Sequence, residues 1–243
     1  MNNKSKNNYI IVNEVPDEYK YTYIGTGCSG RCYITKDGDV YKEFNHNLIS
    51  SYFLKIFTEV KCDSIVFPKE LVYLKEINDD HLIGYKMDYV RGTLLKDLEY
   101  QNISITDYIN ALDKVENDIK DISLKSSIQI DDINPGNVIY TKEKEFKIID
   151  TDFYSCSYSE SPLYVYKSNL REWGNLVLSI IGYNYPFEDY KLNIMFESCI
   201  FNGKVKPSHI IYELYNRLNQ RVDYPIETLE DYNKNLKLLK KVK

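Results

Sequence analysis

The residues best suited to chemistry lie in a short polar segment between apolar runs. Asp132 is followed five residues later by Asn137, and the apolar run 146–149 ends at a second acid, Asp150. A carboxylate can accept the proton of an attacking hydroxyl group. A second carboxylate and an amide oxygen are hard donors of the kind Mg²⁺ prefers, and phosphoryl transfer uses both functions. These residues therefore indicate phosphoryl-transfer chemistry.

The same segment also contains good turn formers. Residues 134–137 read Asn-Pro-Gly-Asn, and such residues tolerate the backbone angles that tight turns need. A turn alone does not account for the β-prone pieces on both sides, at 128–130 and 138–140, or for the second acid, Asp150. We therefore favour the chemical interpretation over a purely structural turn.

A glycine-rich motif, G-x-G-x-x-G, is formed by Gly25, Gly27 and Gly30. Strands are expected on both sides of it, at 19–24 and 32–35, whereas a dinucleotide-binding fold would have a helix after the motif. Positions without side chains let backbone N–H groups approach phosphate oxygens closely. The context therefore predicts a phosphate-covering hairpin, although the motif alone also fits an ordinary turn.

Lys42 lies in the next expected strand, 40–44. A lysine that binds phosphate from this strand needs an acidic partner to hold it; otherwise it is an ordinary surface lysine. We expect Glu59 to be the partner, because Ile56 and Glu59 share one stripe of the amphipathic helix predicted at 48–60.

The elements that must position these residues change in type along the chain. Strands and one helix come first, and helices dominate after Gly92. This order predicts an α+β chain of two lobes. We expect a polar N-terminal tail at 1–14, a sheet lobe at 15–90 and a mainly helical lobe at 91–243. Further strands are expected at 70–74, 82–89 and 146–149, and helices at about 105–122, 170–181, 207–218 and 226–239.

Composition narrows the classes of function. The 243 residues carry a formal charge of −5, which argues against nucleic acid as the main partner, because binding a phosphate backbone usually needs a basic face. No stretch approaches the roughly 20 apolar residues of a membrane span. The five cysteines are an odd number, which argues against a disulfide framework. We therefore expect a cytoplasmic protein.

In chain order these features resemble the protein-kinase superfamily, over roughly residues 18–190. The resemblance implies a bilobal protein-kinase-like fold, with a small antiparallel-sheet lobe carrying one helix and then a helical lobe. It also implies binding of ATP and Mg²⁺. The glycine-rich loop would be Gly25, Gly27 and Gly30. Lys42 would grip the α- and β-phosphates and Glu59 would hold it.

The resemblance also assigns the remaining site residues. Asp132 matches the catalytic-loop aspartate, and Asn137 and Asp150 match the metal-binding asparagine and aspartate. The segment after the fifth strand would contact adenine, with Met87 as the gatekeeper residue followed by the backbone at Asp88 and Val90.

Several positions depart from the family pattern. Asp131 stands where the family has arginine, and Asn134 where it has lysine or histidine. Asp152, two residues after Asp150, is expected to be either an extra metal ligand or a surface charge. Only about twenty residues separate Asp150 from the helix expected near 170, so the peptide-aligning surface is short. Asn169 replaces the aspartate that usually braces the catalytic loop.

Three functions remain open. The first is transfer of the γ-phosphoryl group of ATP to a Ser or Thr hydroxyl of a protein substrate. The second is a small-molecule kinase that phosphorylates another hydroxyl acceptor, resembling aminoglycoside or choline kinases, which Asp152 favours. The third is a non-catalytic pseudokinase that binds a partner, which the retention of Lys42, Asp132, Asn137 and Asp150 disfavours. The acceptor is left open.

Overall fold

The computed structural model describes residues 8–45, 51–180 and 186–239. It confirms the α+β class and divides the chain into two compact units. The first unit contains the residues up to Arg91 together with Ile149–Tyr154, and the second contains Gly92–Ile148 and the residues from Ser155 onward. The segment Ile149–Tyr154, which we expected in the helical lobe, therefore belongs to the first unit.

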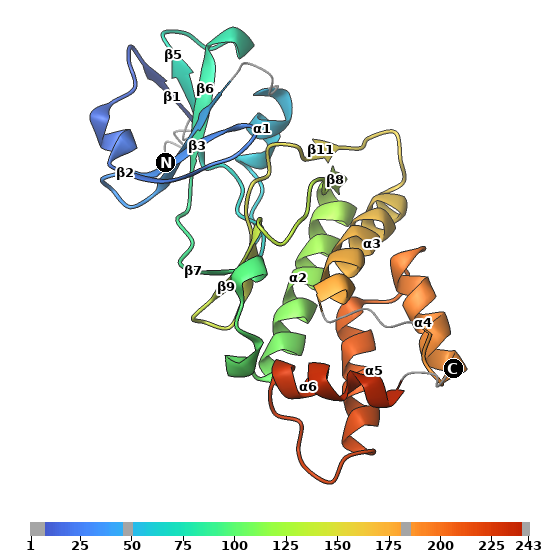
Figure 1. Cartoon of the computed structure of the whole chain (residues 1–243). Helices are drawn as coiled ribbons and strands as arrows, with labels where there is room; N and C mark the ends of the chain where they lie inside the picture. The colour runs from blue at the N-terminus through green and yellow to red at the C-terminus, as the bar shows by residue number, and fades with distance from the viewer. Residues whose placement is uncertain (1–7, 46–50, 181–185, 240–243) are drawn as a thin grey trace, which may run out of the picture. The chain divides into compact units, whose positions relative to one another are not determined.

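The first unit is built on a six-stranded sheet with the order β1-β5-β6-β4-β3-β2 (Figure 1). The strand β1 pairs in parallel with β5, and every other neighbouring pair is antiparallel. The predicted tail 1–14 thus contains an edge strand, and the sheet is mixed rather than purely antiparallel. The strands are β1 Tyr9–Val12, β2 Thr22–Thr26, β3 Gly30–Ile34, β4 Val40–Phe44, β5 Glu70–Leu74 and β6 Leu82–Met87.

A tight turn sets the register of β3 and β4. Gly38 has φ of +93°, which a residue with a side chain rarely adopts. The Thr35 N–H donates to the Asp39 carbonyl at 2.9 Å and so closes the turn. The resulting pairing sets Cys32 opposite Lys42. The Asp37-Gly38 turn therefore determines which residue of β3 lies opposite Lys42.

The helix of the first unit, α1, spans Ser51–Phe57 and buries Leu54 and Phe57. It is shorter than the predicted helix 48–60. Its expected beginning at 48–50 lies outside the described residues. At the other end the helix stops at Phe57, so Glu59 lies in the turn that follows and not on a helical face.

The second unit is mainly helical (Figure 1), and α2 packs against both α3 and α5. Ser104 caps the beginning of α2, where its hydroxyl accepts a hydrogen bond from the Asp107 N–H. The helix α3 begins at Pro162, eight residues before its predicted start at 170, and the last residue of its predicted range, 181, lies outside the described residues. The helices are α2 Ile105–Ser126, α3 Pro162–Ile180, α4 Tyr190–Ile200, α5 Pro207–Asn219 and α6 Leu229–Asn235.

Two small sheets flank these helices. One has the strand order β10-β9-β7, and the other pairs β11 with β8. Phe146 of β10 packs edge-on against Tyr108 and Trp173, with ring centroids 5.5 and 6.3 Å apart, so the strand before Asp150 is anchored in the helical core. The strands are β7 Gly92–Leu94, β8 Ile128–Gln129, β9 Val138–Thr141, β10 Phe146–Ile148 and β11 Ser155–Cys156. Short 3-10 turns occupy Asp17–Lys20, Asp79–His81, Leu95–Asp97, Tyr100–Asn102 and Leu236–Leu239.

A buried carboxylate joins α2 to the beginning of α5. Glu116 is fully buried and accepts hydrogen bonds from the Ser208 backbone N–H at 2.8 Å and the Ser208 hydroxyl at 2.5 Å. The N–H groups of a first helical turn have no partner within their own helix. Burial raises the pKa of Glu116 to about 7, although the hydrogen bonds from Ser208 oppose the rise.

This raised pKa makes the stability of the fold depend on pH. Between the ordinary value of 4.5 and about 7 the folded chain keeps a proton on Glu116 that the unfolded chain loses. The free energy of unfolding should therefore fall as pH rises through this window, by roughly 1–3 kcal/mol. In Glu116→Gln, which retains the hydrogen-bonding shape and cannot titrate, this part of the pH dependence should disappear. Urea unfolding at several pH values measures the free energy of unfolding of wild type and Glu116→Gln. The same dependence of this free energy on pH in both proteins would contradict the assignment.

Candidate functional site

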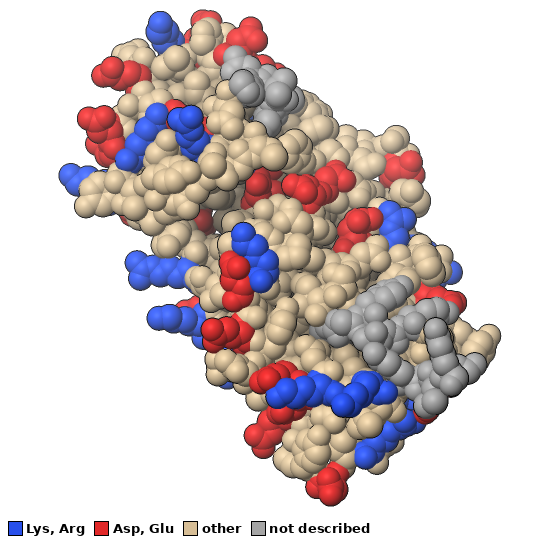
Figure 2. Space-filling view, in the orientation of Figure 1, with Lys and Arg blue, Asp and Glu red and all other residues tan. Residues whose placement is uncertain are grey.

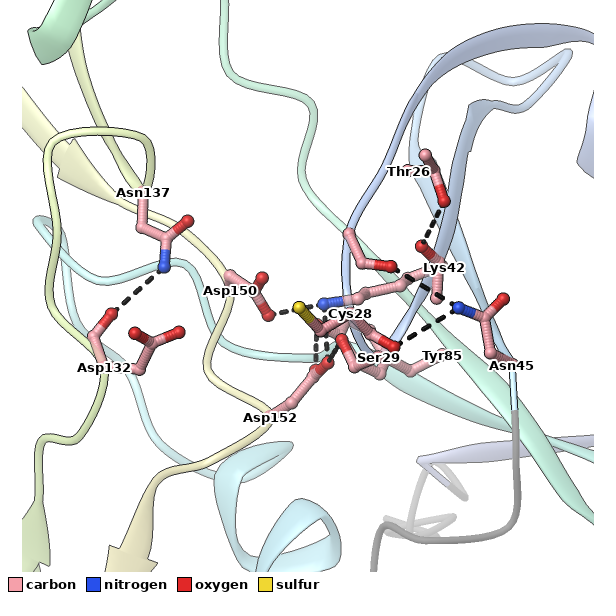
Figure 3. Close-up of polar contacts among 12 residues, drawn as sticks. Thr26, Cys28, Ser29, Lys42, Asn45, Tyr85, Asp132, Asn137, Asp150 and Asp152 are labelled. Carbon is pink, nitrogen blue, oxygen red and sulfur yellow. Dashed lines mark hydrogen bonds and ion pairs between the residues drawn. The ribbon is translucent and has the colours of Figure 1, made fainter.

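Lys42 lies at the centre of a cluster of buried polar side chains in the first unit (Figure 3). It stands on β4 between β3 and β6, facing Cys32 and Tyr85 in the register, and its side chain is 4% exposed. Its ammonium group pairs with the Asp150 carboxylate, to which it donates a hydrogen bond, and with Asp152 Oδ2 at 2.5 Å. The lysine singled out by the sequence is thus a buried cation held by two carboxylates.

The electrostatics of this cluster keep Lys42 charged. Burial alone lowers the pKa of Lys42, but the attraction of Asp152 and Asp150 outweighs it, and the net pKa lies above the ordinary value. Burial and the neighbouring Asp152 raise the pKa of Asp150, and Lys42 opposes that rise. The two acids and one base therefore depend on one another, because each carboxylate is stabilised by the same ammonium group.

Asp152 is the most enclosed member of the cluster, with a side chain that is 0% exposed. In addition to Lys42, it accepts hydrogen bonds from the Ser29 hydroxyl at 2.6 Å and the Tyr85 hydroxyl at 2.7 Å. Burial raises the pKa of Tyr85 well above its ordinary value, so this phenol stays a neutral donor. The expectation that Asp152 could be a surface charge is wrong. Packing in the first unit buries the Asp152 side chain and brings three donors to it, which no local sequence pattern indicated.

The expected ion pair between Glu59 and Lys42 is absent among the described residues. Glu59 is exposed in the turn after α1, and among the described residues no hydrogen bond or ion pair joins it to Lys42. The stripe of apolar residues on which the prediction relied ends with the helix at Phe57. Asp150 and Asp152, from the segment that joins the first unit late in the chain, provide the counter-charge instead.

The glycine-rich motif forms the turn between β2 and β3. The Gly27 N–H donates to the Gly30 carbonyl at 2.9 Å, and the Asn45 amide reaches the carbonyls of Gly27 and Cys28. Gly30 is required by packing, since a Cβ there would lie 2.2 Å from the Glu43 carbonyl oxygen. A Cβ at Gly25 or Gly27 would meet nothing within 4 Å, so these two positions face open space. Side chains are therefore not excluded at Gly25 and Gly27 by packing, in contrast to Gly30.

The three residues expected near adenine lie at the end of β6. Met87 is its last residue and is buried. Asp88 is exposed and pairs with Lys69 at 2.5 Å, and Val90 is half-buried. The side chain of Asp88 is therefore paired with Lys69 and not with Lys42.

Asp132 and Asn137 lie on one loop of the second unit, between β8 and β9. The Asn137 amide donates to the Asp132 carbonyl at 3.1 Å, and the Asn134 amide donates to the same carbonyl at 3.2 Å. Asn134 Oδ1 accepts from the Gly136 N–H. Among the described residues no hydrogen bond engages the Asn137 amide oxygen, so a hard donor is left open beside Asp132 (Figure 3).

The loop that carries Asp132 is braced by a buried asparagine on α3. Asn169 is 0% exposed; its amide nitrogen donates to the Ile128 carbonyl at 2.7 Å and the Ser123 hydroxyl at 2.9 Å. Its amide oxygen accepts from the Ile130 N–H at 2.8 Å. Asn169 therefore holds two backbone groups before Asp132, the Ile128 carbonyl of β8 and the Ile130 N–H just after it.

Two of the candidate carboxylates have unusual backbone conformations. Asp132 has φ of +55° and Asp150 has φ of +66°. Aspartate tolerates this left-handed region better than most residues, but the conformation still costs free energy, and such positions concentrate at functional sites. The two acids selected for their chemistry are thus among five non-glycine residues with positive φ in the described chain.

The structure therefore groups the predicted residues in two sets. Gly25, Gly30, Lys42 and Asp150 belong to the first unit, and Asp132 and Asn137 belong to the second. Ser29 and Tyr85 also belong to the cluster and were not predicted from the sequence. A usable signal existed for Tyr85, because the residue that pairs with Lys42 on a neighbouring strand projects to the same face of the sheet.

The face drawn in Figure 2 carries both signs of charge. On the face drawn in Figure 2, lysine and arginine side chains alternate with acidic ones and form no continuous basic field. None of the helices in residues 8–45, 51–180 and 186–239 combines the length and the apolar character that crossing a membrane requires.

Comparison with known proteins gives no assignment. A scan against protein-family models finds no match, and a search of curated proteins finds none either.

The bracing role of Asn169 can be tested by its removal. Asn169→Ala should leave the Ile130 N–H and the Ile128 carbonyl buried without partners, and the free energy of unfolding should fall by about 2–4 kcal/mol. Asn169→Asp should also destabilise the fold, because a carboxylate oxygen would face the Ile128 carbonyl. Chemical denaturation measures the change. Asn110→Ala, at an exposed asparagine on α2, is the control and should change stability by less than about 0.5 kcal/mol.

Proposed function

We propose that this chain is an ATP-dependent phosphotransferase with a two-lobed, protein-kinase-like fold. The observation that carries the proposal is the ion pair between Lys42 and Asp150. A buried lysine on the strand after a glycine hairpin, in contact with an aspartate, has the arrangement needed to bind phosphate oxygens next to a metal-binding carboxylate. The left-handed conformations of Asp132 and Asp150 support the same assignment independently.

The chemistry of the available donors fits magnesium. Mg²⁺ is usually bound by one or two carboxylates together with substrate phosphates and waters. Asp150 offers a carboxylate that is 27% exposed, and Asn137 offers an amide oxygen without a hydrogen bond among the described residues. When bound with ATP, the ion would supply neutralisation of the charge on the phosphates. Asp152 is less suited as a ligand, because its oxygens already accept from Lys42, Ser29 and Tyr85.

The residues of the chain would bind the phosphates and activate the acceptor. Lys42 would hold the α- and β-phosphates, and the backbone near Gly25 and Gly27 would cover them. Asp132, which is exposed, would orient the acceptor hydroxyl and take its proton. The hydroxyl oxygen would form the new bond to the γ-phosphorus, while the bond to the bridging oxygen breaks and ADP leaves with that electron pair.

The acceptor we favour is a Ser or Thr hydroxyl of a protein. One observation favours a second candidate, a small-molecule hydroxyl. Only residues 151–161 separate Asp150 from the beginning of α3 at Pro162, fewer than the roughly twenty that the sequence analysis allowed. A short segment offers little surface on which to align a peptide. A non-catalytic pseudokinase is disfavoured because Lys42, Asp150, Asp132 and Asn137 are all present.

The proposal predicts that binding and transfer can be separated at Asp132. Asp132→Asn removes the proton acceptor and keeps the shape of the side chain, so ATP should bind with an unchanged dissociation constant. Transfer should fall by about a hundredfold or more, the usual contribution of a general base. Labelled ATP, offered with the protein alone, with a protein mixture and with a pool of small hydroxyl compounds, measures transfer and identifies the acceptor class.

Asp131→Asn, at the exposed neighbouring acid, is the matched control. Equal transfer by wild type and Asp132→Asn would mean that another residue is the base. ATP binding without transfer in any of the three mixtures would support the binding module instead.

A further inference from the structure

Asp152 has no part in the proposed transfer, yet three other side chains converge on it. Its Oδ2 contacts the Lys42 ammonium and the Ser29 hydroxyl, and its Oδ1 accepts from the Tyr85 hydroxyl. These donors come from three different strands or turns of the first unit, as Figure 3 shows. A fully buried carboxylate with several donors is held in one geometry, because each displacement would leave a charged oxygen without a partner.

Lys42 needs such a counter-charge in addition to Asp150. A lysine buried without a carboxylate loses its charge readily. Asp150 is partly exposed, at 27%, and is the carboxylate that the proposed reaction uses for the metal. Asp152, at 0% exposure, has no access to solvent and stays with the lysine. The two acids therefore suit different tasks, although they are only two residues apart.

Asp152 also connects the lysine to the glycine-rich turn. Ser29 lies inside that turn, between Gly27 and Gly30, and its hydroxyl donates to the same carboxylate oxygen that Lys42 contacts. The turn has open space beside Gly25 and Gly27, so this hydrogen bond is an anchor at its far end. The position of the turn is thereby coupled to the position of the ammonium group.

We propose that Asp152 is a positioning residue that holds Lys42 and, through Ser29, the glycine-rich turn in a phosphate-binding arrangement before nucleotide is present. It takes the place of the helical carboxylate that Glu59 does not provide. The proposal rests on the proposed function insofar as the arrangement serves phosphate, but the coupling itself is a property of the protein without ligand.

Three variants each remove a different interaction of the cluster around Asp152. Ser29→Ala removes the anchor of the turn, Tyr85→Phe removes one support of Asp152, and Asp152→Asn removes the charge. Glu43→Gln is the matched control, because Glu43 is the next residue on β4 and its carboxylate pairs with Lys20 instead. Ser29→Ala and Tyr85→Phe change single hydroxyl groups, so the proposal can be judged even if Asp152→Asn does not fold.

The first measurement is amide hydrogen exchange of residues 25–31 in the nucleotide-free protein. Loss of a hydrogen bond to a charged group should speed local exchange by about tenfold in Ser29→Ala and Asp152→Asn. In Tyr85→Phe the increase should be smaller, and Glu43→Gln should match wild type. Exchange of residues 25–31 at the wild-type rate in Ser29→Ala would overturn the anchoring role.

The second measurement is the dissociation constant of Mg-ADP, compared with the unfolding midpoint of each variant. Ser29→Ala and Tyr85→Phe should weaken binding by about threefold to tenfold with little change in the midpoint, and Asp152→Asn should weaken it more. Unchanged affinity in all three variants would overturn the positioning role. If wild type binds no nucleotide, the proposed function fails, whereas the exchange experiment still decides the coupling.

Discussion

The arrangement of the first unit depends on one constraint, the need of a buried ammonium group for counter-charge. Lys42 is on an inner strand of the sheet, where β3 and β6 cover both edges of its backbone. An uncompensated charge there would cost several kcal/mol. The compensation comes from residues more than a hundred positions later, in Ile149–Tyr154, which therefore belong to the sheet unit and not to the helices that precede and follow them.

The segment that supplies the counter-charge follows β10 directly, although β10 itself belongs to the second unit. Phe146 anchors that strand among the helices of the second unit, and Asp150 then adopts a left-handed conformation. The segment thus carries two carboxylates to Lys42 within a few residues of a strand fixed elsewhere. In the second unit, Asn169 supports the loop of Asp132, because its side chain hydrogen-bonds the Ile128 carbonyl and the Ile130 N–H just before that loop. Both candidate acids are supported by residues that would not react themselves.

The parts of the fold that depend on neighbouring residues in the sequence could be predicted from it. The strand 40–44, the Asp37-Gly38 turn and the beginning of α2 follow from alternation, positive φ and capping. The prediction that Glu59 pairs with Lys42 was wrong. A helical stripe shows which residues share a face but not where the helix ends. The helix α4 was overlooked although Leu192, Phe196 and Cys199 have helical spacing and Asp189 caps it. The burial of Asp152 had no local signal, since it arises from packing between distant segments.

We propose that the Lys42 cluster and the Asp132 loop both contribute to binding Mg-ATP. The most direct measurement is amide hydrogen exchange of the whole protein with and without Mg-ATP, followed by mass spectrometry of its peptides. We expect slower exchange on binding in three segments: residues 25–31, 130–138 and 148–154. Unchanged exchange in all three segments at saturating Mg-ATP, or protection confined to other parts of the chain, would contradict this proposal.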